Sequence, residues 1–257
     1  MERLLKTKHN RLRLPLLRLG HQGDRNGAPS AQLTKGEIIS LHDSRKLCCL
    51  RALELVAEQR NGAVVLDVRP AETFAAFHIG GAIQIGLGGP FSSWAAMLLK
   101  PKQAIVVVAD NERSAQEANT RLERVGLGQV IGYSLADELQ WREQNIDLAT
   151  ISTARCADIR ETLERKSSVQ LVDVRSRAEW LKGHLPGAIS LPLLDLESSA
   201  LRIDPAKPSL VYCHEGFRAT TAASILLRES SSDIGILIDG VEGWCASGLP
   251  LEVPTTK

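Results

Sequence analysis

The sequence predicts an α/β protein with two tandem domains, each a parallel β-sheet flanked by helices on both faces. Three observations predict it. The chain has 257 residues, which exceeds the usual size of one domain. Its short apolar runs alternate with segments of helical periodicity, as strands buried on both faces do. Finally, the second half of the sequence repeats the first.

The repeat is clearest where VVLDVRPAETFAAFHIGGAIQI (64–85) aligns with QLVDVRSRAEWLKGHLPGAISL (170–191), at an offset of 106 residues. In both segments an Asp-x-Arg precedes a histidine and a Gly-Ala pair. Farther on, AIVVVADNERSAQEA of the first copy corresponds to PSLVYCHEGFRATTAA of the second. A duplicated unit of about 105 residues has the size of a small domain. We therefore expect a basic N-terminal arm or linker over 1–37, a first domain over 38–146 and a second over 147–257.

Composition narrows the class of protein. A formal net charge of +1 argues against a nucleic-acid or membrane-surface protein. No apolar run approaches the roughly 20 residues of a membrane span. Residues 1–30 carry seven Lys or Arg against two acidic residues. We interpret this stretch as a basic arm, with an organelle transit peptide as the alternative. Five cysteines without a C-x-x-C pair favour a reducing, cytoplasmic compartment, and we expect no metal and no cofactor.

The second domain shows its elements in order. Apolar runs predict strands, and the longer patterned segments between them predict helices. The expected elements are a helix near 153–166, a strand near 169–174, a short helix over 176–182, a strand near 188–191, a strand ending at Cys213, a helix after Arg218 and a last strand in IGILID. In the first domain, Cys48 and Cys49 are expected on a helix. Ligands of such sheets bind beyond the carboxyl ends of the strands, where Cys213 falls.

The stretch LVYCHEGFRATTAAS (210–224) holds the candidate site. An apolar strand leads into a tight loop, Cys213 to Arg218, and the loop leads into a helix. A thiolate at a helix N-terminus is stabilised by backbone N–H groups and by the helix dipole. The alternative is an inert buried cysteine at the end of a strand. Gly216 and Arg218 favour the first interpretation, because an anion cradle needs them and a packed thiol does not.

Together these segments resemble the rhodanese family of sulfurtransferases. Asp-x-Arg, Glu, Gly-His-x-x-Gly-Ala and Cys-x-x-Gly-x-Arg stand in the family order, followed by GVEGW. The resemblance covers nearly all of 151–250 and, more weakly, about 38–145. It implies two tandem rhodanese-like domains, of which the second is active.

The resemblance implies a catalytic Cys213 that attacks a sulfane-sulfur donor and then carries a persulfide. Both states are anions. The loop supplies backbone N–H groups, Gly216 permits its sharp path, and Arg218 is expected to act as a second catalytic residue through its fixed positive charge. We expect the residues between them to bind substrate. His214 and Phe217 would face the mouth of the pocket, whereas Glu215 would point to solvent, because its charge repels anionic donors.

The expected partners are small molecules: thiosulfate or a persulfide as donor, and a thiol or cyanide as acceptor. A protein thiol is a further candidate acceptor, and neither a nucleic acid nor a membrane is expected. The sequence leaves the physiological donor, the acceptor and the oligomeric state open.

The other residues of the motif are expected to support the loop and to take no part in the chemistry. Asp173, Arg175, Glu179 and His184 are expected to hold the surroundings of the loop by buried ion pairs and hydrogen bonds. Trp180 and Trp244 are expected in the core.

The first copy departs from the family at the nucleophile. Val108, Ala109 and Asp110 surround that position, and none of them can carry sulfur. Its loop is also one residue shorter if Arg113 matches Arg218. We therefore expect a catalytically silent first domain.

Two other functions compete. Phosphatases and arsenate reductases of related folds use a Cys-x5-Arg loop, which accepts a whole tetrahedral oxyanion. The loop from Cys213 to Arg218 has four intervening residues, which suits a single extra sulfur atom. The second alternative is a non-enzymatic module in which both copies bind or regulate a partner.

Overall fold

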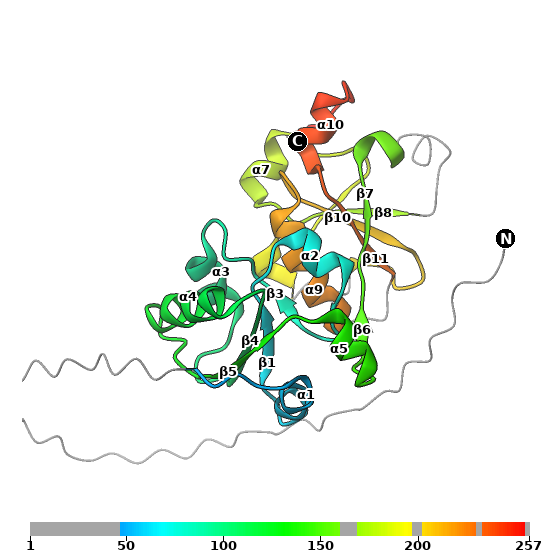
Figure 1. Ribbon diagram of the computed structural model, residues 1–257. Helices are drawn as coiled ribbons and strands as arrows, with labels where there is room; N and C mark the ends of the chain where they lie inside the picture. Colours follow the sequence, from blue (N-terminus) through cyan, green and yellow to red (C-terminus); the bar gives the residue numbers. More distant parts are fainter. Residues whose placement is uncertain (1–46, 160–168, 197–201, 230–232, 255–257) are drawn as a thin grey trace, which may run out of the picture. The chain divides into compact units, whose positions relative to one another are not determined.

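The computed structural model describes residues 47–159, 169–196, 202–229 and 233–254 (Figure 1). The chain divides into two units, 1–44 and 45–257, and all described residues belong to the second. The predicted arm over 1–37 therefore lies outside the described residues. The boundary predicted between 146 and 147 stays a prediction.

The first sheet has the strand order β3-β1-β4-β5, and all its pairs are parallel. Every residue of β1 and β4 is buried, as their uninterrupted apolar sequences require. The strands are β1 (Val64–Asp67), β3 (Ile83–Gln84), β4 (Ile105–Ala109) and β5 (Val130–Leu135). The helices are α1 (Ala52–Arg60), α2 (Ala71–Ala76), α3 (Phe91–Leu98), α4 (Glu112–Glu123) and α5 (Glu138–Glu143).

Helices cover both faces of this sheet because the chain reverses direction within it. From β1 the chain moves outward to β3, and from β3 it returns past β1 to β4 and β5. Right-handed crossovers place the helices of opposite movements on opposite faces. Accordingly α3 packs against α4, and α4 packs on β4 and β5.

The second sheet has the order β7-β11-β10-β8-β9 and is also parallel throughout. Its central strand is β10, which leads to Cys213. The strands are β7 (Ser152–Ala154), β8 (Gln170–Asp173), β9 (Ile189–Ser190), β10 (Ser209–Tyr212) and β11 (Ile234–Leu237). The helices are α7 (Arg177–Lys182), α9 (Phe217–Glu229) and α10 (Gly240–Ala246), with a short 3₁₀ turn η1 (Leu193–Asp195). Separately, β2 (His78–Ile79) pairs antiparallel with β6 (Leu148–Ala149).

The predicted fold class is confirmed, with two local corrections. Residues 152–154 form the edge strand β7 on β11, where the sequence predicted the start of a helix. Helical residues begin at Cys156, and 160–168 lie outside the described residues. The predicted helix at Cys48 and Cys49 was also wrong, since α1 begins at Ala52 and Cys49 forms a parallel β-bridge with Tyr133 of β5.

Helix α9 is buried on all sides, which explains its Ala/Thr/Ser-rich sequence. It packs on β10 and β11 of its own sheet and also on α2 and β3 of the first copy. All residues from 219 to 226 are buried. Small side chains allow this close approach on two sides. The hydroxyl of Thr221 donates to the Gln84 side chain (3.2 Å), and the Gln84 backbone N–H donates to Ser224 Oγ (3.0 Å).

Candidate active site

Cys213 follows the central strand of the second sheet directly. Tyr212, the last residue of β10, is in register with Asp173 of β8, so Cys213 stands at the carboxyl edge of the sheet. Its side chain is buried, with 1% exposed. The backbone N–H of Gly216 donates to Cys213 Sγ over 3.1 Å. An N–H group at the start of α9 therefore points at the sulfur, as stabilisation of a sulfur anion requires.

Two glycines let the loop fold this tightly. Gly216 has φ +89°, and a Cβ there would collide with the carbonyl oxygen of Ile238. Gly240 has φ +48°, and a Cβ there would collide with the carbonyl oxygen of Cys213. The N–H of Val241 donates to that same Cys213 oxygen over 3.0 Å. The start of α10 thus closes on the back of the loop, and no side chain larger than hydrogen fits at either position.

Arg218 forms an ion pair with Glu179 of α7. Its two terminal nitrogens donate to the two carboxylate oxygens over 2.8 and 2.7 Å. Hydrogen bonding to Arg218 is the largest cause that lowers the pKa of Glu179 to about 2. The same bond raises the pKa of Arg218. The charge of Arg218 is therefore already partnered, whereas the sequence led us to expect it to face the donor. Its catalytic role stays a prediction, and its visible contact ties the loop to α7.

Glu179 is itself fixed by the start of α7. It closes a capping box with Ser176, whose hydroxyl lies 2.7 Å from the Glu179 carboxylate. One carboxylate thus caps α7 and holds the start of α9. Glu179 thus makes a supporting contact, as predicted, but its ion pair with Arg218 is partly exposed and not buried.

The other predicted supporting residues also make buried contacts. Asp173 and Arg175 pair at 2.6 Å, and Arg175 donates a further hydrogen bond to the carbonyl of Gly183. His184 stacks on Trp180, with ring centroids 3.4 Å apart. The hydrogen bond given for Cys213 Sγ in the described residues comes from the backbone of Gly216 and from none of these side chains. Trp180 and Trp244 are buried, as predicted.

The first copy repeats this scaffold without the thiol. Asp67 pairs with Arg69 at 2.7 Å, and His78 stacks on Phe74. Val108 stands opposite Asp67, as Tyr212 stands opposite Asp173, so the register gives Ala109 the place of Cys213. The loop is one residue shorter, because α4 begins at Glu112, capped by Asn111. A methyl group therefore stands where the second copy has sulfur.

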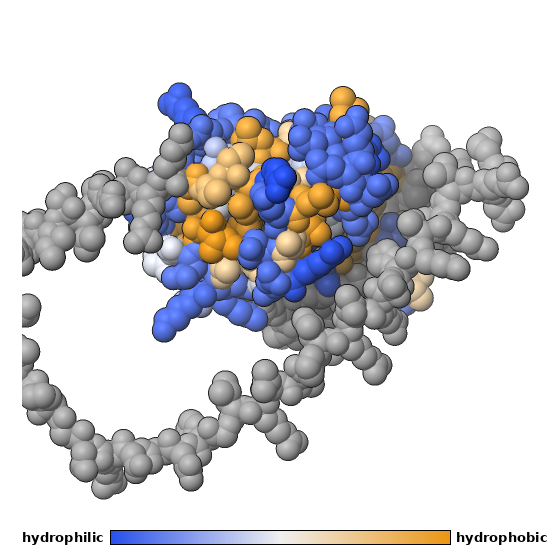
Figure 2. Space-filling view, turned by 60° about the horizontal axis from the view of Figure 1, so that its bottom comes forward, coloured by the Kyte–Doolittle hydropathy of each residue, from blue (hydrophilic) through white to orange (hydrophobic). Residues whose placement is uncertain are grey.

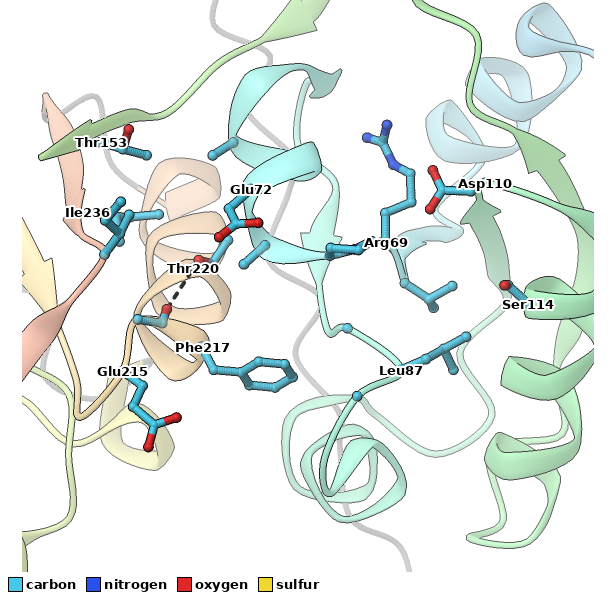
Figure 3. A pocket seen from close by; sticks show the side chains of 18 residues that line it. Arg69, Glu72, Leu87, Asp110, Ser114, Thr153, Glu215, Phe217, Thr220 and Ile236 are labelled. Atoms are coloured by element: carbon cyan, nitrogen blue, oxygen red, sulfur yellow. Dashed lines mark hydrogen bonds between the residues drawn. The ribbon is translucent and has the colours of Figure 1, made fainter. Parts of the chain in front are cut away.

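A cavity of about 510 Å³ lies between the two copies, at the carboxyl ends of both sheets (Figure 3). Three residues of the Cys213 loop line it, Glu215, Gly216 and Phe217, but Cys213 does not. The Phe217 ring points across the cavity toward Leu87 of the first copy. Of the four predicted substrate-binding residues, Glu215, Gly216 and Phe217 thus line one cavity, and exposed His214 does not. Their role in substrate binding stays a prediction.

The predicted orientation of Glu215 agrees with its exposure, since 68% of its side chain is accessible. His214, Glu215 and Glu242 offer ligand atoms within 4.8 Å of one another, and all three are exposed. Within the described residues, this is the group whose donor atoms could hold a metal ion. Sequence reasoning missed Glu242 and also the wall from the first copy, because both depend on how distant segments pack.

No helix in the described ranges combines the length and the apolar character that a bilayer span needs. On the face shown in Figure 2, hydrophobic residues gather in a patch that hydrophilic residues surround.

Each curated relative described here matches this chain over a stretch of about one copy's length. Thiosulfate sulfurtransferase GlpE of Coxiella burnetii is 30% identical over 84 residues, which is 33% of this chain and 78% of the relative. A sulfurtransferase of Allochromatium vinosum is 29% identical over 94 residues, 37% of this chain and 88% of the relative. An HTH-type transcriptional regulator of Mycobacterium tuberculosis is 30% identical over 95 residues, but this chain spans only 42% of its length.

Among solved structures, thiosulfate sulfurtransferase from Pseudomonas aeruginosa is similar over 80% of this chain and 43% of its own, with 22% identity and a TM-score of 0.36. The model of the rhodanese-like domain matches residues 52–135 and again 156–247, together more than half of the chain. The first match spans all strands of the first sheet, and the second spans all strands of the second sheet except β7. The chain therefore belongs to the rhodanese-like family and carries two domains of that family in tandem.

Proposed function

We propose that this protein is a sulfurtransferase that moves a sulfane sulfur from thiosulfate or a persulfide to a thiol or cyanide, through a persulfide on Cys213. One observation carries the proposal: a buried thiol at the carboxyl edge of the sheet accepts an N–H from Gly216 at the start of α9. The family membership gives the reaction class, and the sulfurtransferase relatives support it.

The reaction has two displacement steps. In the first, the Cys213 thiolate attacks the outer sulfur of thiosulfate. The sulfur–sulfur bond of the donor breaks, sulfite leaves with its electron pair, and Cys213 carries a persulfide anion. In the second, the acceptor attacks that outer sulfur, takes it as thiocyanate or a new persulfide, and returns the thiolate. The Gly216 N–H would stabilise the negative charge on sulfur in both the thiolate and the persulfide.

The first domain has no place in these steps, because Ala109 replaces the nucleophile. We propose that it is catalytically silent and shapes the cavity beside the loop. A loop with four residues between Cys213 and Arg218, rather than five, favours sulfur transfer over phosphatase chemistry.

The test is the full-length protein with thiosulfate. Mass spectrometry of its peptides should find one added sulfur atom on the Cys213 peptide, and cyanide should remove it. Cys213→Ser should abolish the transfer, whereas Cys245→Ser, at an exposed thiol, should retain it. The proposal fails if several sulfane donors leave Cys213 unmodified. Phosphate release from an aryl phosphate that requires Cys213 would instead support the phosphatase alternative.

A further inference from the structure

We propose that the cavity between the two copies binds an organic thiol, or its persulfide, with an apolar body and a positive charge, and disfavours anionic compounds. The inference rests on the proposed function, because it names the class of sulfur compound that the Cys213 loop would exchange sulfur with.

The cavity is too large for the smallest sulfur substrates and its walls are largely apolar. At about 510 Å³ it has the volume of a typical small-molecule pocket. Thiosulfate and cyanide would leave most of it empty. The first copy supplies Val68, Ala75 and Leu87, and the second supplies Phe217, Ile236 and Ile238. Burying an apolar chain against these six side chains is favourable, whereas burying a small dianion there is not.

The charged groups of the cavity are acidic. Its lining includes Glu72, Asp110 and Glu215. One cation, Arg69, also belongs to the lining, but its side chain is fully buried and forms an ion pair with Asp67 at 2.7 Å. Within the described residues no cation of the lining therefore remains to balance the three carboxylates. Their joint potential favours a cation and opposes an anion.

The carboxylates come from both copies and surround the apolar wall. In Figure 3, Glu72 reaches from α2 toward Thr220 on α9, and Glu215 lies on the same side as Phe217. Asp110 follows β4 of the first copy, one residue after Ala109. The silent copy thus contributes two of the three negative charges. A ligand whose chain lies along Phe217 and Leu87 can place a terminal ammonium near them and its sulfur beside Gly216, which lines the cavity and whose N–H donates to Cys213 Sγ.

The test uses three six-carbon thiols that differ only at the far end: 6-amino-1-hexanethiol, 6-mercapto-1-hexanol and 6-mercaptohexanoate. The distant group leaves the thiol itself nearly unchanged. With thiosulfate as donor, the expected order of kcat/KM is amine, then alcohol, then acid. We expect about a tenfold spread between amine and acid, since each carboxylate at several ångströms in screened solvent is worth roughly a factor of two to three.

The variant for this test is the double substitution Glu72→Gln with Asp110→Asn, which should reduce the spread to about threefold. Glu143→Gln removes one exposed carboxylate elsewhere and should leave the spread unchanged. Calorimetry with hexylamine and hexanoate, which carry no sulfur, measures the same preference without turnover.

Each outcome bears on the inference. Cyanide turnover with equal use of the three thiols overturns it and leaves the proposed function standing. Selective hexylamine binding that the double variant loses, in a protein without sulfur transfer, supports the cation site and removes the proposed function. A preference for the acid, or a spread that the double variant does not change, shows that these carboxylates do not select the ligand.

Discussion

Gly216→Ala should both destabilise the protein and disable Cys213. At φ +89° an alanine is strained, at a cost of about 1–2 kcal/mol. Its Cβ would also collide with the Ile238 carbonyl oxygen and lie 3.0 Å from the carbonyl carbon, so backbone must move. Overpacking of this kind costs about 1–3 kcal/mol. The free energy of unfolding should therefore fall by about 2–5 kcal/mol.

The matched control is Gly126→Ala. Gly126 also has a positive φ, +79°, but nothing lies within 4 Å of its Cβ position. It should lose only the strain, about 1 kcal/mol. Urea unfolding measures both variants. Because the Gly216 N–H donates to Cys213 Sγ, the rate of persulfide formation should also drop about a hundredfold. Equal stability of the two variants, with full activity in Gly216→Ala, would refute the reasoning.

Two further predictions concern the contacts that hold helix α9. Glu179→Gln should lower stability at neutral pH by about 1 kcal/mol, since the pair with Arg218 is partly exposed. The folded pKa of Glu179, about 2, lies below the ordinary 4.5. The difference in the free energy of unfolding between wild type and Glu179→Gln should thus be largest above pH 4.5 and disappear as pH falls toward 2. Urea unfolding at each pH measures it. Gln84→Ala leaves the Thr221 hydroxyl and the Arg69 carbonyl without their partner and should cost about 2–4 kcal/mol. Gln129→Ala, at an exposed side chain, is its control, and equal unfolding midpoints would contradict the prediction.

The sequence predicted those parts of the structure that local pattern controls. The strand β10, the turn at Gly216 and the helix α9 follow from an apolar run, a glycine and a helical segment in direct succession. The duplication predicted two similar sheets, because equivalent residues of the two copies meet the same neighbours. The register of Val108 and Tyr212 confirms the place of Ala109 within this scheme.

Non-local packing produced what the sequence did not predict. The segment 152–154 has only three residues, and most of them are exposed. It forms a strand because it pairs with the edge of β11. The sequence could not predict the ion pair of Arg218 with Glu179, because the two residues lie 39 positions apart in the chain. The cavity depends on the docking of α9 against the first copy, which no periodicity within either copy encodes.

The packing of the buried helix α9 against the first copy sets the spacing between the two sheets. Its alanines, Ala219, Ala222 and Ala223, keep only a methyl group between backbone and neighbours, and Gln84 reaches Thr221 and Ser224 across the same contact. The volume of these side chains therefore sets the distance between the two sheets, and with it the width of the cavity. A change from alanine to valine on the face toward the first copy would act as a spacer, altering which ligands fit without touching Cys213. Substitutions at residues that do not contact substrate can thus change which substrates such a protein accepts.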